Sequence, residues 1–139
     1  MTVETRSISL STRGHCDIVD ITSEVAKQVF DSGVRDGTVT VFVTGSTAGV
    51  TTIEFEPGLV ADLKEMWSRV VPEKASYHHD SAWGDGNGYA HVRAALLGAS
   101  LVIPLANKRL TLGTWQQIVV IDFDNRPRSR DIIVQLMGE

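Results

Sequence analysis

Alternating apolar and polar positions mark four strand segments in the N-terminal half of the chain. β-Branched residues dominate residues 38–44, and the same character recurs over residues 3–10, 16–19 and 50–55. Val, Ile and Thr favour extended backbone because their branched side chains pack well on a pleated surface. The pattern therefore predicts four strands, bounded by turns that are rich in glycine.

Three further segments are predicted to be helices, and the first two have the apolar spacing of amphipathic helices. Thr22 is a suitable N-cap for the first helix, and Gly33 is its expected C-cap. Pro57 and Pro72 bracket the second helix, since proline is tolerated in a first turn but not in a helix interior. The third helix is expected over residues 88–97, where it ends before a glycine.

The C-terminal third is predicted to be entirely β-structure. Strands are expected over residues 100–105, 109–112, 116–123 and 129–136. Short connections between successive strands favour antiparallel pairs. We therefore expect an α+β fold of mostly antiparallel β-sheet, with two to three helices packed on one face of the sheet.

The composition is that of a single domain spanning residues 1–139. Apolar residues make up 42% of the chain and charged residues 22%, so the chain can bury a core without disulfides. The single cysteine, Cys16, is expected to be a small buried hydrophobe, and its solitary state fits a cytoplasmic location. A net charge of −4 argues against nucleic acid as a partner, and no apolar run reaches the length of about 18 residues that a membrane span needs.

The strongest chemical signal is a polar, glycine-rich segment at residues 77–91, where we expect a loop. It contains three of the four histidines, His78, His79 and His91, together with Asp80. Imidazole and carboxylate groups bind transition metals and transfer protons. Adjacent residues of an extended segment point to opposite sides, so only one of His78 and His79 is expected to face a site, and His91 can turn back towards it. Spacing alone leaves open both a metal or catalytic site and histidines with a structural or surface role.

Two features of the N-terminal half are further candidates. The loop at residues 45–49 carries the hydroxyls of Ser46 and Thr47 and backbone N–H groups that can cradle an anion, although a plain turn has the same composition. Glu54 lies between Ile53 and Phe55 in the predicted strand, where a carboxylate needs a partner, a metal or an open cleft, unless it faces water at a strand edge.

The C-terminal region adds arginines and an aromatic residue. Arg109 and Arg128 have the planar guanidinium group that binds phosphate in a bidentate manner, although salt bridges to the many acids are an alternative for each. Trp115 and Gln116 interrupt the strand pattern next to a glycine. The indole ring is either part of the core or a wall on which a substrate ring can stack.

Several short motifs are spaced along the chain: Gly45-Ser46-Thr47-Ala48, Thr51-Thr52-Ile53-Glu54, Tyr77-His78-His79-Asp80, Ala90-His91-Val92-Arg93-Ala94, Gly113-Thr114-Trp115-Gln116 and Arg126-Pro127-Arg128-Ser129-Arg130. Together they resemble the YjbQ family, also described as secondary thiamine-phosphate synthase, over nearly the whole chain. The resemblance implies an α+β fold, a compact homotrimer with a site at the subunit boundary, and His79 and His91 as metal ligands. The implied activity joins hydroxymethylpyrimidine diphosphate to thiazole phosphate, giving thiamine phosphate and diphosphate.

One position departs from the resemblance. Many members of the YjbQ family have a histidine where this chain has Gly45. A ligand or proton donor contributed by that histidine would be missing here. A different ligand set, or a different chemistry within the family, is therefore expected to be possible for this chain.

We arrive at two expected functions of different classes. In the first, the protein is an enzyme acting on a phosphorylated metabolite, in which His79 and His91 hold a divalent metal ion, zinc before magnesium or manganese. Glu54 or Asp80 then serves as a further ligand or as a base. The expected substrate-binding residues are Ser46, Thr47, Arg109, Trp115, Gln116 and Arg128. In the second, the chain is a trimeric small-anion-binding or regulatory module without turnover. A metal-dependent hydrolase would use the same residues as the first.

Overall fold

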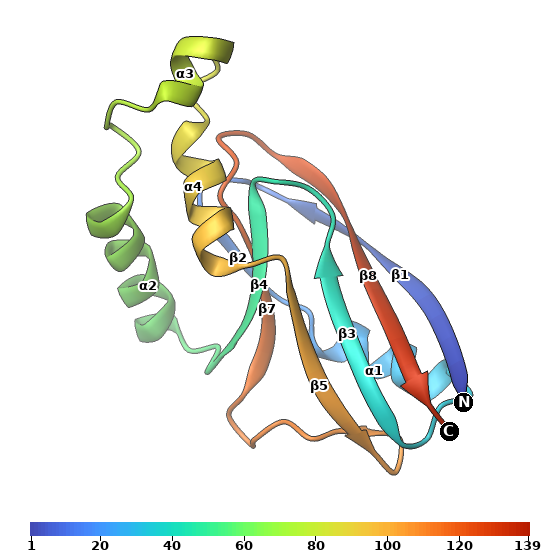
Figure 1. Cartoon of the computed structure of the whole chain (residues 1–139). Helices are drawn as coiled ribbons and strands as arrows, with labels where there is room; N and C mark the ends of the chain where they lie inside the picture. The colour runs from blue at the N-terminus through green and yellow to red at the C-terminus, as the bar shows by residue number, and fades with distance from the viewer.

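Two antiparallel sheets form the framework of the molecule, which we describe from a computed structural model of residues 1–139. The larger sheet has five strands in the order β1-β8-β3-β5-β6, and the smaller has three in the order β2-β7-β4 (Figure 1). The strands are β1 Thr2–Thr12, β2 Asp17–Asp20, β3 Gly37–Val43, β4 Ala48–Ile53, β5 Ser100–Ala106, β6 Arg109–Leu110, β7 Gln117–Asp122 and β8 Arg128–Gly138. The helices are α1 Thr22–Asp31, α2 Pro57–Val70, α3 His78–Trp83 and α4 Gly88–Leu97.

The smaller sheet is buried on both faces, with one apolar core on each side. Ile118 and Val120 of β7 lie in the core between the two sheets, whereas Val119 and Ile121 lie in the core beneath the helices. Successive side chains of a strand point to opposite faces, so a continuous apolar run is what a strand buried on both sides requires. The domain is therefore layered as sheet, sheet and helices.

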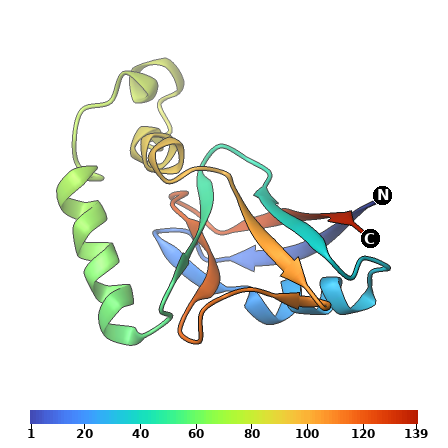
Figure 2. The same cartoon turned by 60° about the horizontal axis from the view of Figure 1, so that its bottom comes forward.

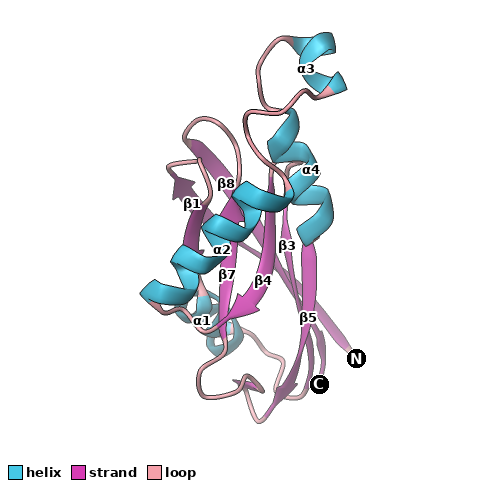
Figure 3. Cartoon of the chain, turned by 90° about the vertical axis from the view of Figure 1, so that its left-hand side faces the viewer, coloured by secondary structure: helices cyan, strands magenta, loops and turns pink.

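The helices α2 and α4 cover the outer face of the smaller sheet, as the green and yellow helices of Figure 2 and the side view of Figure 3 show. Trp67 of α2 packs edge-to-face on Phe123, with ring centroids 4.9 Å apart. Gly49 of β4 lets α4 come close, because a Cβ atom there would lie 2.6 Å from the carbonyl oxygen of Gly98. The short helix α3 projects beyond the ends of the strands (Figures 1 and 3).

The predicted α+β class with antiparallel sheets is confirmed, but the predicted pairing of successive strands is wrong. Only β5 and β6 pair as neighbours in the chain, while β1 pairs with β8 and β4 with β7. The connections from β1 to β2, from β3 to β4 and from β6 to β7 cross from one sheet to the other. Short connections are compatible with both outcomes, and burial of the apolar faces against each other selects the crossing arrangement.

The helices also differ from the predictions in three respects. They do not share one face, because α1 places Val25 and Val29 in the core between the sheets. The C-cap of α1 is Ser32, whose hydroxyl donates to the carbonyl of Val29 at 2.7 Å, rather than Gly33. The polar segment expected to be a loop contains α3. None of the helices is both long enough and apolar enough to cross a bilayer.

Candidate functional site

His79 lies in the first turn of α3. Tyr77 precedes this helix in extended backbone, and Gly84 ends it in the left-handed conformation at φ 67°. Successive residues of a helix are rotated by about 100°, so His78 and His79 diverge although the backbone is not extended. His78 is exposed and His79 is half-buried, which leaves one of the two to face the site, as expected.

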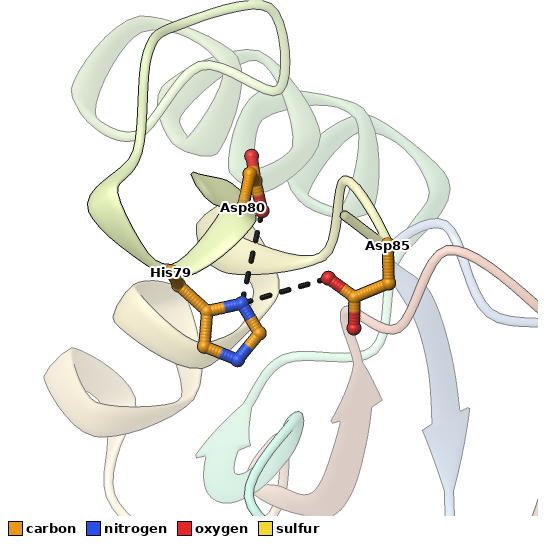
Figure 4. Close-up of side chains that lie close together, drawn as sticks. All are labelled: His79, Asp80 and Asp85. Carbon is orange, nitrogen blue, oxygen red and sulfur yellow. Dashed lines mark ion pairs between the residues drawn. The ribbon is translucent and has the colours of Figure 1, made fainter. Parts of the chain in front are cut away.

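The Nδ1 atom of His79 faces two carboxylates (Figure 4). It lies 3.7 Å from Asp80 Oδ1 and 3.6 Å from Asp85 Oδ1, and it is buried without a hydrogen-bond partner. Both separations are too long for a hydrogen bond. They are close to the ~3.4 Å between two ligand atoms that bind one zinc ion tetrahedrally at about 2.1 Å. The three side chains therefore have the donor types and the spacing of a divalent-metal site.

His91, in the first turn of α4, places its ring against that of His79. The ring centroids are 4.3 Å apart and the ring planes are inclined by 37°. The ligand atoms that lie within 4.8 Å of one another are nevertheless those of His79, Asp80 and Asp85. The geometry thus favours one histidine with two carboxylates over the expected pair of histidines, and it makes His91 a neighbour of that group.

Asn87 is a buried residue that fixes the segment between α3 and α4 through hydrogen bonds. Its side chain is buried, its Nδ2 donates to Asp124 Oδ2 at 3.2 Å, and its Oδ1 accepts from the N–H of Asn125 at 3.0 Å. Its own backbone N–H donates to Asp85 Oδ1 at 3.2 Å, and its carbonyl accepts from the N–H of His91 at 3.4 Å. One residue therefore positions both Asp85 and His91 relative to the end of β7.

Asp124 is a fully buried carboxylate that joins three segments. Its Oδ2 accepts hydrogen bonds from Thr47 at 2.9 Å, from Asn87 at 3.2 Å and from Arg128 Nε at 2.9 Å. Burial alone would raise the pKa of this carboxyl group, but the hydrogen bonds from Thr47, Asn87 and Arg128 outweigh it and hold the pKa below its usual value. Asp124 is therefore charged at neutral pH and forms an ion pair with Arg128.

A second buried ion pair lies under the loop between β3 and β4. Arg130 donates through Nε and Nη2 to the two oxygens of Asp122 at 2.8 and 2.9 Å, and its Nη2 also donates to Thr47 Oγ1 at 2.5 Å. Thr12 donates to the same carboxylate at 2.6 Å. Such a bidentate buried pair keeps its geometry, because losing either partner would leave an unpaired charge. The hydroxyl of Thr47 is thus fully engaged within the protein.

The loop and α4 line an open cavity of about 290 Å³. Its walls are formed by Gly45, Ser46, Ala48, His91, Ala94, Ala95, Gly98 and Ala99. Apart from His91 and Ser46 these residues are glycine and alanine, so the cavity is bounded by backbone and small side chains. The structure therefore brings the expected Ser46 and His91 to one cavity, next to the His79 group.

Four of the expected site residues lie elsewhere. Glu54 follows the end of β4, is exposed, and borders a shallow pocket with Trp115 and Gln116. At roughly 3.3 Å per residue, β4 spans about 20 Å from its end beside the cavity to Glu54. The indole of Trp115 is 72% exposed and so is not part of the core, and Arg109 lies on β6 at that end of the molecule. Within one chain, these residues and His79 do not form one site.

Five residues of these contacts were assigned no site role from the sequence: Asp85, Asn87, Asp122, Asp124 and Arg130. Asp85 and Asn87 nevertheless lie in the polar segment at residues 77–91, and Arg130 lies in the arginine-rich motif. The signal that singled out Glu54, an acid at the end of an apolar strand, applies equally to Asp122 and Asp124. Both of these carboxylates are buried and paired, whereas Glu54 faces water. The pattern is the same for all three, and only the tertiary surroundings distinguish them.

The similarity to known proteins agrees with the fold and extends over all the residues of the candidate site. A protein of Methanothermobacter thermautotrophicus described as UPF0047 protein is 38% identical over 139 residues, 100% of this chain and 95% of the relative. A YbjQ-like protein of unknown function from Sulfolobus solfataricus superposes with a TM-score of 0.94 at 34% identity, covering 99% of each chain. An uncharacterised conserved protein of the yjbq/upf0047 family from Clostridium acetobutylicum gives a TM-score of 0.86 at 37% identity, over 95% of this chain and 99% of that one. The family model for UPF0047 protein YjbQ-like matches residues 6–139, and the chain belongs to that family.

Proposed function

We propose that the protein is a metal-binding enzyme that acts on a phosphorylated small molecule. The observation that carries the proposal is the Nδ1 atom of His79, which is buried without a hydrogen-bond partner and lies 3.7 and 3.6 Å from carboxylate oxygens of Asp80 and Asp85. A nitrogen in that position is stabilised by a cation shared with the two carboxylates. The ligand set is His79, Asp80 and Asp85.

The mixture of donors supports zinc before manganese or magnesium. Imidazole nitrogen with carboxylate oxygen suits zinc, whereas magnesium prefers oxygen ligands alone. Asp80 Oδ1 also accepts the N–H of Gly88 at 2.8 Å, and Asp85 Oδ1 accepts that of Asn87 at 3.2 Å, so both carboxylates are held in place by backbone. Three protein ligands leave room for a substrate oxygen on the ion.

The cavity next to this group is where the reacting part of the substrate is proposed to lie. His91 lines the cavity and touches the ring of His79, so it can exchange a proton with a substrate atom there. A bound divalent ion would supply Lewis-acid stabilisation of charge on a phosphoryl oxygen. Transfer of a pyrimidine group from a diphosphate, with diphosphate as leaving group, is the first reaction to test for this chain.

A homotrimer with the site at the subunit boundary is part of the proposal. The outer face of the five-stranded sheet supports self-association, because Asp131 is the only charged residue that it exposes along β1, β8, β3 and β5. Phe42, Val102 and Met137 are exposed on it by 42%, 61% and 43%. An uncharged, partly apolar sheet face is typical of a protein interface.

Metal analysis of wild-type protein and two single variants tests the core of the proposal. After dialysis against zinc and then buffer, wild type is expected to retain one zinc ion per chain, and His79→Ala to bind at least about tenfold more weakly. His78→Ala is the matched control, since His78 is the exposed neighbour on the same helix, and it should bind like wild type. Equal binding by wild type and His79→Ala would refute the ligand assignment.

Turnover is tested separately on the same proteins. The zinc-loaded wild type is incubated with hydroxymethylpyrimidine diphosphate and thiazole phosphate, and thiamine phosphate is measured against His79→Ala and His78→Ala. Product from wild type and His78→Ala but not from His79→Ala would support the enzyme. Zinc binding together with phosphate-ester binding, but without product from any phosphorylated substrate of a generic panel, would favour the alternative, a trimeric small-anion-binding module.

A further inference from the structure

The loop between β3 and β4 presents three consecutive backbone N–H groups that have no acceptor within the chain. These are the N–H groups of Gly45, Ser46 and Thr47. The loop is fixed at both ends, because Thr44 donates through N–H and Oγ1 to the carbonyl of Asp131 at 3.2 and 2.9 Å, and the carbonyl of Thr47 accepts from the N–H of Phe123 at 2.9 Å. Successive N–H groups of a turn that are not engaged within the chain can bind an anion when they point to the same side.

Arg130 lies directly beneath this loop. The residue is only 7% exposed, its Nε and Nη2 atoms are bound to Asp122 and Thr47, and its Nη1 atom has no hydrogen-bond partner. Nη1 is not fully buried, so it remains accessible from the surface. A guanidinium nitrogen held in place by its other bonds is a preorganised donor for an oxyanion.

Gly45 is what leaves that nitrogen uncovered. A Cβ atom at position 45 would lie 2.6 Å from Arg130 Nη1, and the φ angle of Gly45 is +119°, which residues with a side chain rarely adopt. Any side chain at this position would therefore cover Nη1 or displace the loop. The absence of a side chain at position 45 therefore leaves an opening onto a nearly buried arginine.

Arg128 adds a second cation beside the same loop. Its Nε binds Asp124 Oδ2 at 2.9 Å, the oxygen that also accepts from Thr47, and its two Nη atoms have no partner. Its side chain is 36% exposed. Arg128 and Thr47 thus bind the same carboxylate oxygen, and the two free nitrogens of Arg128 belong to a partly exposed side chain.

We propose that the Gly45–Thr47 amides and Arg130 Nη1 form a binding subsite for a phosphoryl group, with Arg128 at its rim. The subsite borders the cavity that His91 lines, so a phosphoryl group held here extends towards the His79 group. The inference rests on the proposed function in taking the substrate to be phosphorylated, and it specifies that the substrate carries a phosphate separate from the atoms at the metal. Three N–H donors and one guanidinium suit the several oxygens of a tetrahedral anion better than the two of a carboxylate.

The test is a titration of ¹⁵N-labelled, metal-free protein with inorganic phosphate, with acetate in a parallel series. We expect the amide resonances of residues 45–47 to shift and saturate with phosphate and to respond only weakly to acetate. Gly45→Ala is expected to weaken phosphate binding at least about tenfold, which is roughly 1.4 kcal/mol. Gly84→Ala is the matched control, because Gly84 also has a positive φ but has nothing within 4 Å of an added Cβ atom. It should bind phosphate like wild type.

A second variant separates loss of Arg130 Nη1 from a change in the loop. Arg130→Lys keeps a cation but removes the nitrogen at Gly45, so phosphate binding should fall as in Gly45→Ala while the remaining resonances stay dispersed. If this variant does not fold, the comparison of phosphate binding by Gly45→Ala and Gly84→Ala still tests the subsite. Saturation without shifts at residues 45–47, equal binding by Gly45→Ala, or an equal response to acetate would overturn the subsite.

The proposed function and this subsite fail in different ways. Zinc binding is measured without phosphate, and phosphate binding is measured without zinc. If zinc binds at His79 but phosphate leaves residues 45–47 unaffected, the metal site stands and the subsite is wrong. If phosphate binds at the loop but zinc does not bind at His79, the subsite stands and the proposed metal enzyme is wrong.

Discussion

Asn87 donates a side-chain hydrogen bond of 3.2 Å to the buried carboxylate of Asp124, and this bond joins the start of α4 to the end of β7. Because Asp124 also binds Thr47 and Arg128, the same carboxylate is shared by the helix that carries His91, the small-residue loop and the last strand. The group of His79, Asp80 and Asp85 and the loop at residues 45–47 are thus connected to one buried polar network. Substitutions in that network are expected to affect both.

Asn87→Ala should destabilise the protein by about 1–3 kcal/mol, because the substitution removes one of three hydrogen bonds to the buried carboxylate oxygen of Asp124 and leaves the part-buried N–H of Asn125 without its acceptor. Urea denaturation at neutral pH measures the change in the free energy of unfolding. Gln135→Ala is the control, since Gln135 is also an amide but makes one exposed hydrogen bond, to Thr5. It should change stability by less than about 0.5 kcal/mol. Equal effects of the two substitutions would contradict a structural role for the Asn87 network.

Asp85→Asn should weaken zinc binding by about tenfold or more while the fold is retained. The amide keeps the size of the carboxylate but loses the charge that faces His79 Nδ1 at 3.6 Å. Isothermal titration with zinc measures the affinity, and circular dichroism checks the fold. Asp62→Asn is a suitable control because Asp62 is an exposed carboxylate of α2 without an ion pair. Unchanged zinc affinity in Asp85→Asn would remove this residue from the ligand set.

Acid should destabilise the protein in part through Asp124. Its pKa is lower in the folded than in the unfolded state, because three hydrogen bonds outweigh its burial. The unfolded chain therefore binds the proton more readily, so this contribution is complete above the unfolded pKa of about 4 and is lost as the pH falls through the lower folded pKa. Asp124→Asn should be less stable than wild type at neutral pH, and its stability should fall less steeply below about pH 4. Parallel acid denaturation curves of the two proteins would contradict this.

Gly49→Ala should destabilise the protein by about 1–3 kcal/mol through overpacking. The added Cβ would lie 2.6 Å from the carbonyl oxygen of Gly98 and 2.8 Å from Leu97 Cδ2, so α4 would be pushed away from β4. Thermal unfolding measures the cost. In Gly113→Ala the nearest atom is 3.7 Å away, and the melting temperature should be unchanged or slightly raised. Comparable losses in both variants would argue against close packing of α4 on β4.

Local patterns in the chain determine the elements well. Apolar periodicity and terminal prolines place α2 correctly at Pro57–Val70, and the β-branched runs lie where β3 and β7 are found. These signals are local, because a helix or strand depends on backbone preferences and on the side chains nearest in sequence. The helix α3 was not predicted, because the apolar pattern of a six-residue segment is too short to distinguish a helix from a turn.

The local sequence also indicates the candidate residues: a histidine and carboxylates near positions 79–91 and a loop of small residues near position 46. Only the tertiary structure decided which of them meet. The pairing of β3 with β8 brings Arg130 beneath Gly45, the contact between the start of α4 and the end of β7 brings Asp124 against Asn87, and Glu54 is left at the far end of β4. The physical reason is that burial of two apolar cores fixes the strand order, whereas turn residues and spacing along the chain do not specify that order.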